Sequence, residues 1–135
     1  MPDNGLTIKK GWEFDLIFRT GLRIQGELVR LLFLRGSGAP SRLCARAGYA
    51  VGKRQGRAHV RNRGRRILRE AFRRLRPWVV PDVDLVLSLR DRALGAGAVE
   101  IYRDMAKLLG RNGLFVTDWP GADWNRVGRT SGNEK

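Results

Sequence analysis

The densest chemistry in the sequence is a run of cations between Lys53 and Arg76. These 24 residues hold eleven Lys or Arg and a single acid, Glu70, so they account for +10 of the net charge of +14. Arginine makes up 22 of the 27 basic residues of the chain. Its planar guanidinium binds phosphate through two hydrogen bonds and stacks on bases. The composition therefore indicates a polyanionic partner, and the preference for arginine suits folded RNA.

A simpler interpretation is that this run is only a solvated surface. Such a surface intersperses both signs of charge and forms ion pairs between residues four apart, whereas here one acid stands among eleven cations. The loop at 52–57 reads Gly-Lys-Arg-Gln-Gly-Arg, which lacks the G-x-x-x-x-G-K-[ST] spacing of a nucleotide-binding loop. It precedes a helix, however, and a helix N-terminus directs free N–H groups at an anion. We therefore favour nucleic-acid binding.

A rival hypothesis is a nuclease whose catalysis lies in the protein. Hydrolysis of a phosphodiester by protein-bound metals needs clustered carboxylates around two ions about 4 Å apart. The nearest grouping is Asp82, Asp84 and Asp91, of which the first two follow a proline where a strand is expected to begin. The single cysteine, Cys44, and the single histidine, His59, do not supply an internal disulfide or a zinc site. We predict no metal site and no catalytic residue in the protein.

The cations need a scaffold, and the hydrophobic pattern predicts one. Residues 58–75 have helical periodicity and are stopped by Pro77. On this helix Arg61, Arg65, Arg69, Arg73 and Arg76 are expected on the side opposite the apolar face, flanked by Arg66. Further helices are predicted at 11–19 and 98–109, strands at 23–34, 43–51 and 83–89, and a loop at 36–40.

The predicted order is α-β-β-α-β-α, which indicates an α+β fold with one sheet layer covered by helices. The strands on either side of helix 58–75 are expected to be parallel neighbours. With 135 residues, the chain has the length of one domain. We divide it into a flexible lead-in at 1–10, a single nucleic-acid-binding domain at 11–115, and a disordered tail at 116–135 that contains Trp119 and Trp124.

One face of the strand at 43–51 is unusually small. Its alternating pattern places Leu43, Ala45, Ala47, Tyr49 and Val51 on one side. The other side carries Cys44, Arg46, Gly48 and Ala50. Since that side is small and holds an arginine, we expect something other than a packed core to lie against it.

The segment from Ala50 to Arg73 reads A-V-G-K-R-Q-G-R-A-H-V-R-N-R-G-R-R-I-L-R-E-A-F-R. It resembles the signature of the bacterial ribonuclease P protein subunit family, K-K-x-G-x-A-V-x-R-N-R-x-K-R-x-x-R-E-x-F-R. A bare R-N-R would be a weak signal, but the whole run, placed after a strand and on a helix, is specific. The resemblance extends more loosely from Leu6 to Phe115.

The resemblance implies a two-layer α/β sandwich of the ribosomal protein S5 domain 2-like type. It also implies a left-handed crossover between the parallel strands, although general rules favour a right-handed one. The protein would join a catalytic RNA to form the enzyme that removes the 5′ leader from precursor tRNA. Mg²⁺ and the cleavage chemistry would belong to the RNA, and the protein would bind no cofactor and need no protein partner.

The resemblance also assigns site residues. The surface that binds the catalytic RNA would comprise Lys53, Arg54, Arg57, Arg61, Asn62, Arg63, Arg65, Arg66, Arg69 and Arg73. The cleft that holds the single-stranded leader would comprise Phe14, Phe18, Arg46, Gly48 and Ala50. Aromatic rings and cations in a shallow groove suit unpaired nucleotides, which bind by stacking.

Three positions depart from the family pattern. Gly64 replaces an apolar residue inside the helix, Leu32 stands where some members carry a cleft aromatic, and His59 replaces an apolar residue.

A third hypothesis, a ribosomal or general RNA-binding protein without a processing role, uses the same cations. The sequence shows neither a signal peptide nor an apolar run longer than Leu31–Leu34, so we expect a cytoplasmic protein without membrane attachment.

Overall fold

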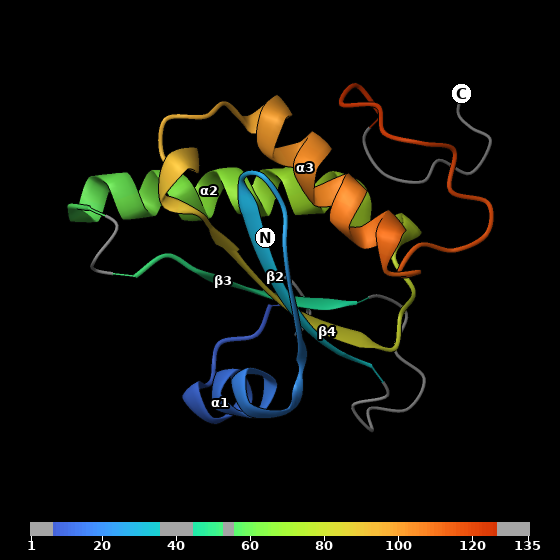
Figure 1. Ribbon diagram of the computed structural model, residues 1–135, viewed down its shortest axis with the longest axis horizontal. Helices are drawn as coiled ribbons and strands as arrows, with labels where there is room; N and C mark the ends of the chain where they lie inside the picture. The colour runs from blue at the N-terminus through green and yellow to red at the C-terminus, as the bar shows by residue number, and fades with distance from the viewer. Residues whose placement is uncertain (1–6, 36–44, 53–55, 127–135) are drawn as a thin grey trace.

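The computed structural model describes residues 7–35, 45–52 and 56–126, in which helices lie on both faces of one mixed sheet (Figure 1). Lys53, Arg54, Leu43 and Cys44 lie outside the described residues. The helices are α1 (Gly11–Thr20), α2 (Ala58–Leu75) and α3 (Ala98–Arg111), and the strands are β1 (Leu22–Gln25), β2 (Val29–Arg35), β3 (Arg46–Ala50) and β4 (Val83–Leu89). Short 3-10 helices follow α2 at Arg76–Trp78 and β4 at Asp91–Ala93.

The strands are arranged in the order β1-β2-β4-β3. β1 and β2, and β2 and β4, pair antiparallel, whereas β3 and β4 pair parallel. The expectation that the strands flanking α2 are parallel neighbours is therefore confirmed. The left hand of their crossover stays a prediction. β1 and β3 form the two opposite edges of the sheet.

The structure corrects the single strand predicted at 23–34, which is a hairpin of β1 and β2. The Gly26 N–H donates to the carbonyl of Val29 at 2.9 Å and closes the turn. The buried carboxylate of Asp104, on α3, accepts three further N–H groups, from Glu27 at 3.2 Å, Leu28 at 2.8 Å and Val29 at 2.9 Å. Because Asp104 lies far from the turn in the sequence, no local pattern predicts this turn.

Two hydrophobic cores lie on the two faces of the sheet. α2 and α3 cover one face and enclose the larger core, in which Phe72, Leu85, Leu87 and Tyr102 are fully buried (Figure 1). α1 covers part of the opposite face, where its Ile17 packs with Ile8, Leu32 and Val86. The two-layer α/β sandwich is thus present, with α1 added behind it. β4 is buried on both faces, which is why its sequence is almost continuously apolar.

The glycine inside α2 allows the helix to approach the sheet closely. A Cβ atom on Gly64 would lie 3.1 Å from Leu89 Cδ1 and 3.4 Å from Val51 Cγ2. Gly64 faces the sheet and is buried. The departure from the family pattern at this position therefore concerns helix–sheet packing, not the surface of α2.

The structure also corrects the disordered tail for residues 116–126, which pack on α2 and α3. The Trp119 ring stacks on Phe115 at a centroid distance of 4.1 Å and meets Trp78 edge-on at 5.9 Å. Trp124 meets Tyr102 edge-on at 5.5 Å, and the Arg74 guanidinium lies 3.8 Å from the Trp124 ring centroid. Two aromatic anchors outweigh the polar composition of this segment. Residues 127–135 of the predicted tail lie outside the described residues.

Candidate RNA-binding surfaces

The outer surface of α2 is a row of polar and cationic side chains. Exposed positions recur every three or four residues, as expected for the solvent face of a helix. They are His59, Asn62, Arg63, Arg66, Arg69 and Arg73. We call Arg63, Arg66 and Arg69 the arginine ridge. None of these three forms an ion pair with another residue in the described part of the chain.

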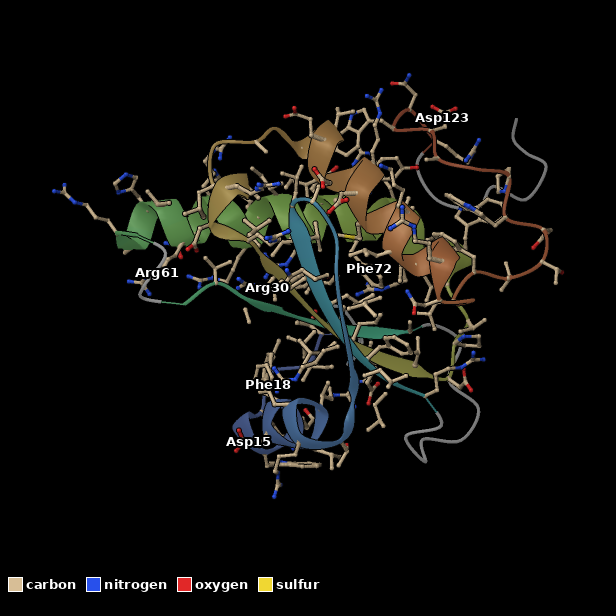
Figure 2. The ribbon with its side chains drawn as sticks, in the orientation of Figure 1. Asp15, Phe18, Arg30, Arg61, Phe72 and Asp123 are labelled. Carbon is tan, nitrogen blue, oxygen red and sulfur yellow. The ribbon has the colours of Figure 1, made fainter. Side chains whose placement is uncertain are left out.

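Arg61 and Arg65 lie beside this ridge instead of on it, which corrects the predicted row. Arg61, near the amino-terminal end of α2 in Figure 2, donates to the carbonyl of Gly56 at 3.2 Å. Arg65 donates to the carbonyl of Val51 at 3.3 Å and to the side chain of Asn62. Arg76 is in the 3-10 helix that follows, 5.1 Å from the Phe72 ring centroid. Counted around the helix, Arg61 and Arg65 lie only about 60° and about 100° from Gly64, which faces the sheet. They therefore border the apolar face, and the prediction that they lie opposite it was wrong.

The one acid of α2 pairs with cations of the last turns. Glu70 accepts from Arg73 at 2.8 Å and from Arg74. These pairs reduce the positive charge at the end of α2 and leave most of it in the first three turns. At the start of α2, Arg57 occupies the N-cap position with no capping hydrogen bond from its side chain, and the first turn contains no acid. The free helix dipole therefore adds to the positive potential there.

The five residues predicted for the leader cleft are brought together between α1 and β3, and we call them the α1–β3 surface. Phe14 and Phe18 stack with ring centroids 6.3 Å apart. A Cβ atom on Gly48 would lie 2.7 Å from Phe14 Cζ, so only glycine admits the ring at this depth. Ala50, like Phe14, packs against the smaller core. Phe18 remains 37% exposed, and its side chain lies on the side of α1 that faces the sheet (Figure 2).

Arg46 differs from the expectation of an available cation. Its Nη2 lies 2.6 Å from Glu13 Oε2, and the two side chains are only 20% and 17% exposed. Much of its charge is therefore neutralised, and the ion pair attaches α1 to β3. Sequence analysis did not single out Glu13, since nothing local links it to a residue 33 positions away. Two sequence features pointed to this pair: Glu13 is an acid in the first turn of a predicted helix, and Arg46 is the only cation on the small face of the predicted strand.

The three acids of the rival nuclease do not converge. Asp82 and Asp91 lie at opposite ends of β4, a strand of seven residues that separates them by roughly 20 Å. Asp82 pairs with Arg35 at 3.9 Å on the surface. Among the described residues, no three His, Cys, Asp or Glu side chains gather as metal ligands would. These positions lack the geometry that two-metal hydrolysis needs.

Comparison with known proteins decides between a processing subunit and a general RNA-binding protein. The family model described as Ribonuclease P matches residues 3–113 of this chain. The chain belongs to this family. It is a ribonuclease P protein component, a subunit of the ribonucleoprotein endoribonuclease that matures the 5′ end of tRNA, and its partner is the ribonuclease P RNA. The third hypothesis, a general or ribosomal RNA-binding protein, is set aside.

Relatives of the ribonuclease P protein agree in length and fold. The ribonuclease P protein component of Natranaerobius thermophilus is 35% identical over 110 residues, which cover 82% of this chain and 92% of that protein. The RNase P protein of Thermotoga maritima superposes with a TM-score of 0.68 at 26% identity, covering 78% of this chain and 96% of that one. The RNase P protein of Staphylococcus aureus gives 0.71 at 22% identity, covering 82% and 98%.

Proposed function

We propose that the arginine ridge of this ribonuclease P protein binds phosphates of the catalytic RNA. The observation that supports the proposal most strongly is the exposure of Arg63, Arg66 and Arg69 without an ion-pair partner among the described residues. Three adjacent unpaired cations on a helix destabilise it slightly, and phosphates would reverse that effect. Arg57, Arg61, Asn62 and Arg65 would contact the RNA beside the ridge, where the N-terminus of α2 adds a positive dipole. Lys53, Arg54 and Arg73 complete the proposed surface.

The α1–β3 surface would hold the single-stranded 5′ leader of precursor tRNA. An exposed Phe18 ring, supported from behind by Phe14, offers a face on which an unpaired base can stack. Gly48 would act by admitting the Phe14 ring that fills the space over it, and the small methyl group of Ala50 would leave room for the nucleotide backbone. Arg46 would act mainly by fixing α1 against β3 through Glu13. Leader recognition would thus depend on one exposed ring held by a rigid pair of elements.

The protein would contribute affinity and position, while cleavage would use the RNA and its Mg²⁺. This division of roles is supported by acids that do not converge within the described chain. We place the assembly in the cytoplasm, with no obligatory protein partner. None of the helices in the described ranges has the length and apolar composition of a membrane span.

Reconstitution tests this proposal. The purified protein, its cognate RNA and precursor tRNAs with and without a leader would be mixed at low Mg²⁺, and the cleavage rate and substrate affinity would be measured. We expect the protein to increase affinity for the leader-bearing substrate only. Equal affinity for both substrates would contradict leader binding. Cleavage by the protein without RNA that disappears in Asp82→Ala would contradict the assignment of catalysis to the RNA.

Replacing Phe18 by alanine is expected to weaken binding of leader-bearing precursor by about tenfold, because stacking contributes roughly 1–3 kcal/mol per base. Affinity for leaderless tRNA should not change. The measurement is equilibrium binding of both RNAs to the reconstituted complex. Leu16→Ala is the matched control, since Leu16 is 39% exposed on the same helix and Phe18 is 37% exposed. An equal loss in both variants would show that α1 acts only as a scaffold.

A further inference from the structure

A second cationic surface follows the edge of the sheet formed by the β1–β2 hairpin. A hollow of about 480 Å³ on this edge is lined by Arg23, Ile24, Gln25, Arg30, Leu31 and Leu32. A second hollow of about 390 Å³ is lined by Gln25, Gly26, Glu27, Arg90, Asp104, Lys107 and Arg111. Gln25 belongs to both, so the two hollows adjoin. We call the cations Arg23, Arg30, Arg90, Lys107 and Arg111 the hairpin track.

The hairpin track begins on the same face of the sheet as the α1–β3 surface. Strand register places Gln25, Arg30, Ser88 and Ala50 in one row across the four strands. Directly paired residues project on the same face of a sheet, so Arg30 shares a face with Ala50. Arg23 also reaches the α1–β3 surface, because its Nη2 donates to the carbonyl of Phe18 at 3.0 Å.

The acids of the two hollows are engaged elsewhere. Asp104 is buried and accepts the three N–H groups of the hairpin turn. Glu27 lies 3.7 Å from Arg92, a cation outside the track. Within the described chain, Arg23, Arg30, Lys107 and Arg111 form no ion pair. Lys107 and Arg111 are exposed one turn apart on α3, so the track presents unpaired positive charge to solvent.

We propose that the hairpin track binds the sugar-phosphate backbone of leader nucleotides that lie farther from the tRNA than those on the α1–β3 surface. This inference rests on the proposed function of that surface. β3 and β1 are opposite edges of the sheet. A leader RNA that begins at β3 beside α2 and crosses the face covered by α1 therefore leaves the sheet at β1. The track then turns around the hairpin to α3, on the other face (Figure 1). A flexible single strand can follow this turn, whereas a stiff duplex cannot.

The test compares two leader lengths in the reconstituted complex. Precursors with leaders of about 4 and about 12 nucleotides, both within the range of single-strand site sizes, would be bound to wild-type protein and to the variant Arg30→Gln, Lys107→Gln, Arg111→Gln. We expect the longer leader to bind wild type about tenfold more tightly, and the variant to lose this gain. Loss of three single-strand phosphate contacts should also make the slope of log K against log[salt] for the long leader shallower by about 2 in the variant.

A control variant removes three exposed cations outside the track, with Arg19→Gln, Arg35→Gln and Arg103→Gln. It should retain the gain from the longer leader. Unchanged binding of the short-leader precursor would show that the track variant is folded and that the α1–β3 surface still works. The inference is contradicted by an equal gain in wild type and track variant, by the absence of a gain in wild type, or by an equal loss for both leaders. Leader-independent binding by wild type would instead overturn the proposed function itself.

Discussion

The combined variant Arg63→Ala, Arg66→Ala, Arg69→Ala is expected to bind the catalytic RNA roughly 100-fold more weakly than wild type. Each exposed guanidinium would lose a phosphate contact of about 1 kcal/mol, and a total of about 3 kcal/mol corresponds to that factor in Kd. The ridge side chains have few contacts of their own, chiefly Arg63 with the carbonyl of Leu94 at 3.3 Å and Arg69 over the Tyr49 ring at 5.3 Å. The folded structure should therefore tolerate the change, and equilibrium binding at fixed salt measures it.

A charge-matched control distinguishes direct phosphate contacts from the general attraction between RNA and a positively charged protein. Arg19→Ala, Arg35→Ala and Arg103→Ala remove the same three charges from positions outside both proposed surfaces. We expect this variant to bind the catalytic RNA within about threefold of wild type, because salt screens exposed charges beyond about 10 Å. If the control loses as much affinity as the ridge variant, net charge and not the ridge explains binding.

Replacing Asp104 by alanine is expected to lower the free energy of unfolding by about 3–5 kcal/mol. The change leaves three N–H groups of the hairpin turn without their acceptor, and each buried unsatisfied donor costs about 1–3 kcal/mol. Some of these groups would gain water at the turn, so the costs do not add fully. Unfolding in denaturant measures the loss of free energy, and we expect the m-value to stay unchanged.

Two further variants define the cause of this loss. Asp104→Asn keeps one carbonyl oxygen, and since two of the three bonds go to Oδ2, it should destabilise the protein by about half as much as alanine. Asp15→Ala removes an exposed carboxylate of α1 and should change stability by less than about 0.5 kcal/mol. A small effect of Asp104→Ala would mean that the hairpin turn does not depend on α3.

The elements with regular periodicity were predictable, while those fixed by distant contacts were not. α2 and β4 repeat their apolar residues over many positions, and both occur where the sequence places them. The β1–β2 turn carries only Gly26 as a local breaker, and its cap comes from Asp104 on α3. The segment with Trp119 and Trp124 has no regular apolar pattern, and the partners of these two rings, Trp78 and Tyr102, lie in earlier elements. Burial of these rings is visible only in three dimensions.

The candidate surfaces were predictable to a similar extent. The family motif located α2 as the cationic helix. The small face of β3 was expected to face something other than a packed core, but the Phe14 ring and the smaller core lie against it. The partners of individual arginines were not predictable, since Arg65 donates to the carbonyl of Val51 and Arg46 pairs with Glu13. The hairpin track combines strand, loop and helix residues that share no local motif.

The salt dependence of binding to the catalytic RNA tests the central claim most directly, because each phosphate contact adds a known amount to the slope. About six contacts from the arginines of α2 predict that log K falls against log[salt] with a slope of about −4 to −5 for wild type. The ridge variant should retain a slope of only about −2 to −3. Equal slopes for wild type and the ridge variant would mean that Arg63, Arg66 and Arg69 do not contact phosphate, and the account of α2 would be wrong.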